Sequence, residues 1–257
     1  MLLVIDIGNT NTSLGVFERE KLAAHWRLTT ARSRTVDEWG VHTRNLFALA
    51  GLDFKSIDAI AIASVVPPLN FTLKQMSETY FHLTPLFIDH TINTGVPILY
   101  DPPSDVGADR IVDAVAAIQK YGAPCIVVDF GTATTFDAIN AKGEYLGGVI
   151  TPGITISSDA LFERAAKLPR VEIKRPQKVI GSATVEAMQS GLYHGYAGLV
   201  DGILKKMIDE LGGAPTVIAT GGLAPLIAKG SEFIQEVDQN LTLDGLRLVY
   251  KRVAGLH

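Results

Sequence analysis

The sequence predicts an α/β protein built from two similar halves. An apolar strand that ends in aspartate, followed by a glycine-containing turn and a second strand, occurs near the N-terminus and again in mid-chain. The two aspartates, Asp6 and Asp129, lie 123 positions apart in a chain of 257 residues. A repeat offset near half the chain length indicates two similar halves and excludes a solenoid of short repeats. We expect the halves to be residues 1–115 and 116–257.

Apolar periodicity and turn residues predict the elements of the first half. Strands are expected at residues 2–7, 13–18, 22–28, 57–66 and 86–89. Helices are expected over 36–49 and 69–81, where apolar residues recur at helical spacing.

The pattern then begins again. A helix is expected from 107 to about 122, followed by strands at 125–129, 136–139 and 145–150, a long helix over 184–211 and a strand at 216–220.

Composition narrows the class of protein. Hydrophobic residues make up 47% of the chain and charged residues 19%, with a mean hydropathy of +0.23. The apolar runs are far shorter than the roughly 20 residues that span a bilayer, and the single cysteine cannot form an internal disulfide. We expect a cytoplasmic protein with no membrane partner. The net charge of −4 argues against a nucleic-acid partner. The basic cluster at 167–178 is interpreted as a solvated loop or edge region, with a binding patch as the alternative.

The repeated turn has the chemistry of a phosphate site. Glycine lets backbone N–H groups approach a phosphate closely, threonine and serine hydroxyls add donors, and an aspartate at a strand end suits Mg²⁺. In the first copy these residues are Asp6, Ile7, Gly8, Asn9, Thr10, Asn11, Thr12 and Ser13. The second copy runs from Asp129 through Gly131 and Thr132 to Asp137. The alternative interpretation of either turn alone is an ordinary turn capped by aspartate.

A third glycine element follows the last predicted strand. Gly221 and Gly222 leave a flat opening against which an adenosine could lie, although paired glycines also form ordinary strand-to-helix turns. The sequence contains neither a Walker-type loop nor a Gly-x-Gly-x-x-Gly fingerprint after a strand.

Together these motifs resemble the ASKHA superfamily of acetate and sugar kinases, heat-shock chaperone ATPases and actin. Within it the chain resembles the type III pantothenate kinases. The resemblance rests on residues 6–12, Ser64-Val65-Val66-Pro67, Gly107-Ala108-Asp109-Arg110 and 129–137. It implies two ribonuclease-H-like halves with an ATP cleft between them.

The resemblance also implies an activity and its site. ATP and pantothenate would give ADP and 4′-phosphopantothenate, the first step of coenzyme A biosynthesis, in a homodimer. Asp109 would be the general base. Residues 6–13, Thr132 and the two glycines at 221–222 would bind ATP, with Mg²⁺ on the Asp6 side and a monovalent cation, K⁺ or NH₄⁺, at Asp129. The residues implied to bind pantothenate are Tyr100, Gly107, Ala108, Asp109, Arg110 and Thr184.

The residues themselves allow alternatives at the implied base. An aspartate at a helix start can serve only the helix dipole, beside a surface arginine, and Tyr100 can be ordinary half-buried packing. Asp101 and Asp105 are rival bases, and Asp113 lies one turn beyond Asp109 on the same predicted helix face.

Four glycines mark one face of the long predicted helix: Gly191, Gly195, Gly198 and Gly202. Each glycine costs about 1 kcal/mol relative to alanine in a helix interior. We expect this face to pack on another helix, either within the chain or across a dimer contact, and to order Thr184.

Two other classes of function use the same fold. One is a nucleotide-dependent switch, for which 257 residues leave little room for extra subdomains. The other is a non-catalytic regulatory protein, which the intact aspartates at 6, 109 and 129 weaken as an interpretation.

Overall fold

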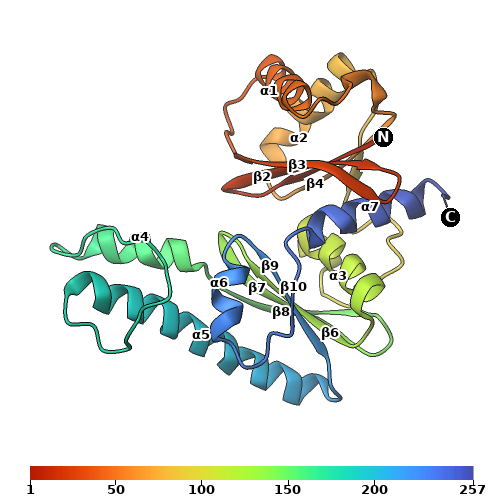
Figure 1. The fold of residues 1–257 in the computed structure, drawn as a ribbon. Coiled ribbons are helices and arrows are strands. Elements are labelled where there is room, and N and C mark those ends of the chain that lie inside the picture. Colours follow the sequence, from red (N-terminus) through yellow and green to blue (C-terminus); the bar gives the residue numbers. More distant parts are fainter. Residues whose placement is uncertain (257) are drawn as a thin grey trace. The chain divides into compact units, whose positions relative to one another are not determined.

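The computed structural model describes residues 1–256 and divides into two compact units. The first unit is Met1–Ala116 together with the C-terminal segment from Leu241, and the second is Ala117–Asn240. The predicted second half, 116–257, included that C-terminal segment. In the structure its helix, α7 (Leu241–Val253), instead packs on the first sheet (Figure 1).

The first unit is built on a mixed sheet. Its strand order is β3-β2-β1-β4-β5, where β1 is antiparallel to β2 and parallel to β4. The strands are β1 (Leu2–Ile7), β2 (Asn11–Glu18), β3 (Lys21–Thr29), β4 (Ala59–Ser64) and β5 (Leu86–Ile88). The helices are α1 (Val36–Leu49), α2 (Pro67–Met76) and α3 (Ala108–Tyr121), of which α3 ends in the second unit. Single turns lie at Phe54–Ser56, Ser77–Phe81 and Pro103–Asp105.

Both faces of this sheet are covered because its central strands are apolar on both sides. Leu3 and Ile5 of β1 pack with Trp39 of α1 and Leu73 of α2. The alternate residues of β1 face the other side, where Val4 belongs to a cluster with residues of α3 and α7. Strands buried on both faces are typical of parallel pairing, as seen between β1 and β4.

The second unit repeats this topology with β6 in the place of β1. The strand order is β10-β9-β6-β7-β8, with β6 antiparallel to β7 and parallel to β9. The strands are β6 (Cys125–Phe130), β7 (Ala133–Ile139), β8 (Tyr145–Pro152), β9 (Thr216–Gly221) and β10 (Glu236–Val237). The helices are α4 (Ile154–Arg164), α5 (Thr184–Leu211) and α6 (Ala224–Ile227), followed by a single turn at Ala228–Gly230. The predicted α/β fold with two similar halves is confirmed.

The two copies of the turn differ in length. In the first unit, Ile7 pairs with Thr12 and four residues, 8 to 11, form the turn. In the second, Phe130 pairs with Thr134 and three residues, 131 to 133, form it. The copies are therefore related in topology but are not identical in the donors they present.

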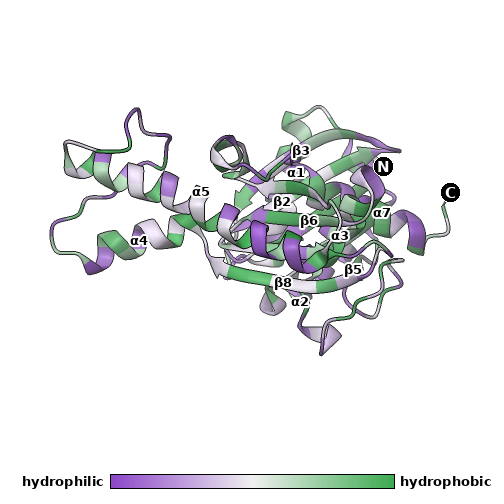
Figure 2. Ribbon diagram, turned by 90° about the horizontal axis from the view of Figure 1, so that it is seen from below, coloured by the Kyte–Doolittle hydropathy of each residue, from purple (hydrophilic) through white to green (hydrophobic). Residues whose placement is uncertain are grey.

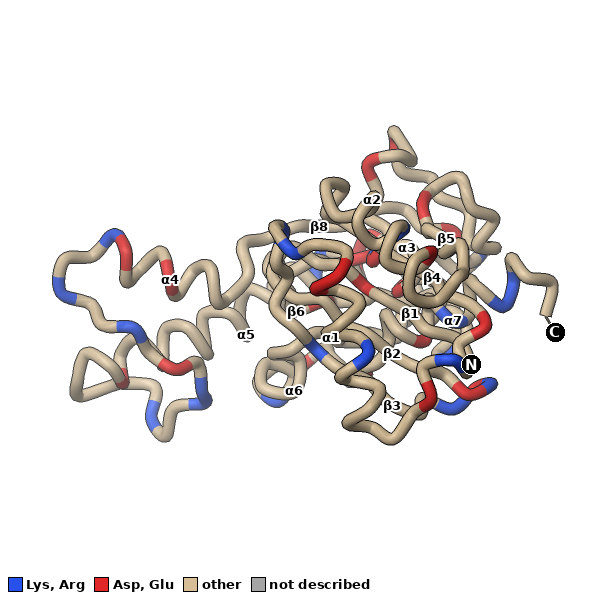
Figure 3. The backbone as a smooth tube through the Cα atoms, turned by 90° about the horizontal axis from the view of Figure 1, so that it is seen from above, with Lys and Arg blue, Asp and Glu red and all other residues tan. Residues whose placement is uncertain are grey.

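Helices α4 and α5 run antiparallel to each other and extend away from the second sheet (Figure 2). The segment between them, 165–183, has no helix or strand, and several lysine and arginine residues lie along it (Figure 3). The predicted loop at 167–178 is thus confirmed. None of the helices within residues 1–256 combines the length and apolar character needed to cross a membrane.

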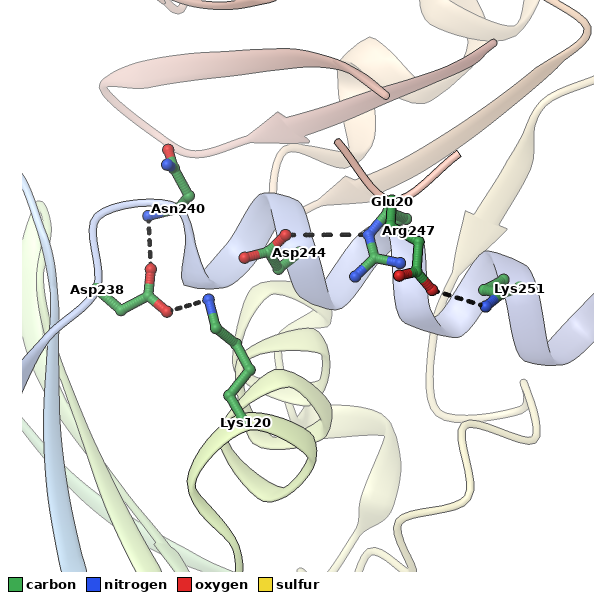
Figure 4. A network of polar contacts seen from close by, with 7 residues as sticks. All are labelled: Glu20, Lys120, Asp238, Asn240, Asp244, Arg247 and Lys251. Atoms are coloured by element: carbon green, nitrogen blue, oxygen red, sulfur yellow. Dashed lines mark hydrogen bonds and ion pairs between the residues drawn. The ribbon is translucent and has the colours of Figure 1, made fainter. Parts of the chain in front are cut away.

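Polar contacts fix the segments that enter and leave α7 (Figure 4). In the second unit, Lys120 of α3 forms an ion pair with Asp238, whose other oxygen accepts a hydrogen bond from the Asn240 N–H at 3.1 Å. In the first unit, Lys251 of α7 lies 3.2 Å from the Glu20 carboxylate. A partly buried ion pair is worth more than an exposed one, so the Lys120–Asp238 pair is the stronger anchor.

The close packing of α7 against α3 at Gly245 predicts how a substitution there changes stability. A side chain at Gly245 would overlap the carbonyl oxygen of Val112 in α3. We expect Gly245→Ala to destabilise the protein by about 1–3 kcal/mol, as overpacking does, in denaturant unfolding followed by circular dichroism. Thr242→Ala on the same helix is the control and should change stability by less than about 0.5 kcal/mol. Equal stability of the two variants would show that α7 does not pack this closely.

Candidate functional site

A backbone hydrogen bond closes the first turn. The Gly8 N–H donates to the Asn11 carbonyl at 3.0 Å, and a side chain at Gly8 would start 3.0 Å from that same oxygen. Asp6, near the end of β1, pairs in register with Ser13 of β2 and Ala63 of β4. Asn9 and Thr10 are exposed at the tip. The turn therefore presents amide, hydroxyl and backbone donors beside a half-buried carboxylate.

The segment Gly107–Arg110 lies at the same edge of the first sheet. Val65, which directly follows β4, donates its N–H to the Ile7 carbonyl at 3.0 Å. A side chain at Gly107 would start 3.2 Å from Val65 Cγ1 and 2.5 Å from Asp109 Oδ1. Glycine at 107 thus leaves room for the Asp109 carboxylate, close to Val65, which is hydrogen-bonded to the last residue of β1.

The surroundings of the Asp109 carboxyl change its pKa. Burial raises the pKa of Asp109 above its ordinary value of 3.8, and the opposing hydrogen bond from the Arg110 N–H, 2.8 Å from Asp109 Oδ1, does not cancel the rise. A carboxyl with a raised pKa is a better proton acceptor when ionised. Arg110 itself is buried at 8% exposure.

The rival carboxylates lie in different surroundings. Asp101 and Asp105 are exposed, and Asp105 accepts a hydrogen bond from the Ser104 hydroxyl at 3.4 Å. Asp113 is buried at 3% exposure, one turn further into α3. Asp109 is half-buried beside Gly107 and has a pKa raised by burial, which favours it as the base.

In the second unit, three predicted residues meet at the ends of β6 and β9. Asp129 pairs in register with Thr220, one residue before Gly221. A side chain at Gly131 would start 3.2 Å from Asp129 Oδ2, and one at Gly221, whose φ is +89°, would overlap Asp129 Oδ1. The two glycines therefore form a cradle around the Asp129 carboxylate that any other residue would fill.

Thr132 is exposed in the second turn, and its carbonyl accepts the Gly153 N–H at 3.1 Å. Gly153 is the N-cap of α4, so this bond ties the second turn to the start of that helix.

Other predicted residues lie elsewhere. Tyr100 is half-exposed in the loop before α3, and Gly222 is exposed after β9. Thr184 begins α5 at the end of the helix pair remote from the second sheet (Figure 1). There it lines a cavity of ≈ 550 Å³ together with Leu161, Leu168, Met188, Gly191 and Tyr196. The second unit therefore does not bring Thr184 together with Asp129 and Thr132.

The carboxylates suit the cations that the resemblance implies, each in its own way. Mg²⁺ is usually held through one or two carboxylates, water and substrate phosphates, so Asp6 beside a phosphate-binding turn is sufficient. The cradled Asp129 offers oxygen ligands without side-chain crowding. Among residues 1–256, no group of three or more His, Cys, Asp or Glu is arranged to hold a metal ion.

The segment that follows β3 supports the first turn, which was not predicted from the sequence. The Thr30 hydroxyl donates to the Gly8 carbonyl at 2.7 Å and shares a hydrogen bond of 2.9 Å with Thr12. Arg32 donates to the Asn9 side chain at 3.0 Å. Only the pairing of β2 with β3 brings these residues to the turn, and no local motif indicates it.

Solved structures with the same architecture are known. The chain resembles a ROK hexokinase from Thermus thermophilus with a TM-score of 0.52 and 13% identity, covering 98% of this chain and 99% of that one. It also resembles the activator of the 2-hydroxyisocaproyl-CoA dehydratase from Clostridium difficile with a TM-score of 0.56 and 12% identity, covering 99% and 96%. At these identities the likeness concerns the fold, which is the ASKHA fold that the motifs predicted.

Sequence comparison is more specific. The family profile described as type III pantothenate kinase matches residues 2–206. Proteins named type III pantothenate kinase from Koribacter versatilis and from an Anaeromyxobacter species (strain Fw109-5) are each 60% identical, over 98% of this chain and 96% and 99% of theirs. One from Halalkalibacterium halodurans is 57% identical over 98% of this chain and 99% of its own.

The order of the motifs, the geometry around Asp109 and Asp129 and these matches agree, and the chain belongs to the type III pantothenate kinase family.

Proposed function

We propose that this chain transfers the γ-phosphoryl group of ATP to pantothenate, giving ADP and 4′-phosphopantothenate at the start of coenzyme A biosynthesis. The observation that carries the proposal is the position of the Gly107–Arg110 segment against Val65, which is hydrogen-bonded to Ile7 at the end of β1, in a chain 60% identical to named relatives. We also expect a cytoplasmic protein.

Asp109 acts as the general base in this proposal. The primary hydroxyl of pantothenate must lose its proton as the new P–O bond forms, and a positioned carboxylate accepts it. Gly107, Ala108 and Arg110 hold pantothenate next to that carboxylate, and a buried guanidinium is suited to bind a substrate carboxylate. Tyr100 and Thr184 are further pantothenate residues by this proposal.

The nucleotide is held by residues 6–13, Thr132 and the glycines at 221 and 222. Mg²⁺ held on the Asp6 side would neutralise phosphate charge, which is the main requirement of phosphoryl transfer. A monovalent cation, K⁺ or NH₄⁺, would be held by Asp129, and the glycine cradle around that carboxylate supports the assignment. The protein's own contribution is otherwise to position the two substrates.

Asp109→Asn tests the proposal. General-base catalysis contributes about 10²–10⁴-fold, so we expect pantothenate-dependent ADP formation to fall by that factor in a coupled assay. Asp105→Asn, which changes an exposed rival carboxylate in the same segment, should keep wild-type turnover. Wild-type turnover in Asp109→Asn would exclude Asp109 as the base. ADP release that does not depend on pantothenate would indicate a nucleotide switch, and no turnover in the wild type would indicate a regulatory protein.

The raised pKa of Asp109 predicts how activity depends on pH. Only the ionised carboxylate accepts a proton, so kcat/KM should fall as the pH is lowered through the raised pKa of Asp109, above the ordinary aspartate value of 3.8.

A carboxyl with a raised pKa stabilises the folded state at low pH, and this contribution is lost as the pH rises through that pKa. Asp109→Asn should therefore raise the Tm relative to wild type near neutral pH, and the difference should shrink as the pH falls. A lower Tm for the variant at neutral pH would contradict a strained, buried carboxylate.

We further propose a homodimer in which a second copy covers the glycine face of α5. A side chain added at Gly191, Gly195, Gly198 or Gly202 would meet nothing within 4 Å, so of the two expected alternatives the packing of this face within the chain is wrong. Exposed apolar residues surround the helix pair, among them Val179 at 65% and Ile180 at 88% exposure. Such patches mark interaction sites. A two-fold contact uses one patch on both copies, which makes a second copy the simplest partner.

Gly195→Leu tests the dimer. We expect the wild type to sediment as a dimer and the variant to shift towards monomer, because leucine blocks close approach of the backbones. Asn45→Leu, at an exposed position of α1, is the control and should leave sedimentation unchanged. A monomeric wild type, or a dimer that Gly195→Leu leaves intact, would contradict the assignment of this face.

A further inference from the structure

The first phosphate turn contains an acidic residue but no basic residue. Between Asp6 and Ser13 the chain carries one aspartate together with amide and hydroxyl residues, and neither lysine nor arginine. A triphosphate brings several negative charges to such a turn. Other phosphate-binding loops include a lysine that reaches the phosphates. A positively charged side chain that acts beside the proposed Mg²⁺ at this turn would therefore come from another segment of the chain.

The segment that follows β3 is fixed to the turn by three hydrogen bonds at one residue. The Thr30 N–H donates to the Thr10 carbonyl at 2.9 Å. Its hydroxyl donates to the Gly8 carbonyl at 2.7 Å and lies 2.9 Å from the Thr12 hydroxyl. Because Thr30 is bonded at both its backbone and its side chain, the position of the next residues relative to the turn is well defined.

Arg32, two residues after Thr30, places a positively charged side chain at the first turn. Its Nη2 donates to Asn9 Oδ1 at 3.0 Å, at the exposed tip of the turn. The acceptor is a neutral amide, and Arg32 makes no ion pair with any carboxylate among residues 1–256, so its charge is not neutralised. Arg34, two residues on, is used differently: its guanidinium lies over the Trp39 ring, 4.7 Å from the centroid. The two arginines of this segment thus have separate roles.

We propose that Arg32 is a phosphate-binding residue of the nucleotide site, whose guanidinium contacts the β- or γ-phosphate of ATP at the first turn. This inference rests on the proposed function. A guanidinium presents its N–H donors in a planar fork that matches phosphate oxygens. Asn9 holds the fork at the turn before the nucleotide arrives, which lowers the entropy lost when the contact forms.

A purely structural role for Arg32 predicts a different result. If Arg32 only orients Asn9, its loss disturbs the turn for every nucleotide. If it contacts a phosphate beyond the first, binding of ATP should weaken while binding of AMP does not. The number of phosphates on the nucleotide therefore separates the two roles.

The test is calorimetric titration of the full-length protein with Mg-ATP and with AMP. A hydrogen bond to a charged group is worth enough to change affinity by about 10- to 100-fold. We expect Arg32→Gln to raise the Kd for Mg-ATP by that factor, to leave the Kd for AMP unchanged, and to keep the wild-type Tm. Arg32→Lys should recover part of the loss because it keeps the charge but not the fork. Arg44→Gln, an exposed arginine on α1, is the matched control and should bind both nucleotides like wild type.

Two results would overturn the proposal. Wild-type affinity of Arg32→Gln for Mg-ATP would exclude a phosphate contact, and an equal loss of ATP and AMP binding would assign Arg32 a structural role. A wild type that binds neither nucleotide would instead refute the proposed function, and the role of Arg32 with it.

Discussion

Parallel pairing of two buried strands determines where the functional residues of each unit lie. In the first unit, β1 pairs with β4, so the turn after β1 and Val65 after β4 emerge at the same edge of the sheet. Gly107 packs against Val65, and this contact brings Asp109 to that edge from more than 40 residues further along the chain. In the second unit, β6 pairs with β9, and Gly221 meets Asp129 for the same reason. Residues at the carboxyl ends of parallel strands converge without any contact between their own side chains, which is why such edges hold ligands in α/β proteins.

The repeated topology does not require repeated chemistry. The turn after β1 has four residues and tolerates a tip that carries Asn9 and Thr10, whereas the turn after β6 has three and is enclosed by Gly131 and Gly221. The residues that support the two turns, which follow β3 in the first unit and β8 in the second, differ as well. Thr30 fixes the first turn through its hydroxyl, while the second is tied through Thr132 to Gly153, the cap of α4. One copy can thus specialise in phosphate and Mg²⁺ and the other in a monovalent cation, on the same framework of strands.

Helices whose apolar residues recur at helical spacing could be predicted from the sequence. The helix predicted at 36–49 is confirmed at both ends. Apolar residues recur in it at helical spacing, and Thr35 and Glu38 form a capping box at its N-terminus. The helix at 184–211 is confirmed as well. The expected helix over 69–81 begins earlier, at Pro67, because proline suits the first helical turn, and it changes to a π-turn at Ser77. The place of α7 on the first sheet could not be predicted, since nothing within 241–253 specifies which of two similar sheets it covers. The contacts of Thr30 and Arg32 depend on the register between β2 and β3, which contains an irregularity at Val16 and Phe17.

Following the γ-phosphoryl group tests whether this chain phosphorylates pantothenate. The purified protein would be incubated with ATP labelled in the γ-phosphate, Mg²⁺, K⁺ and pantothenate, and the products separated and identified by mass spectrometry. We expect the label to appear on pantothenate, in equal amount to the ADP formed, and we expect ADP formation to stop when pantothenate is omitted. Label found only in inorganic phosphate, with or without pantothenate, would contradict this expectation.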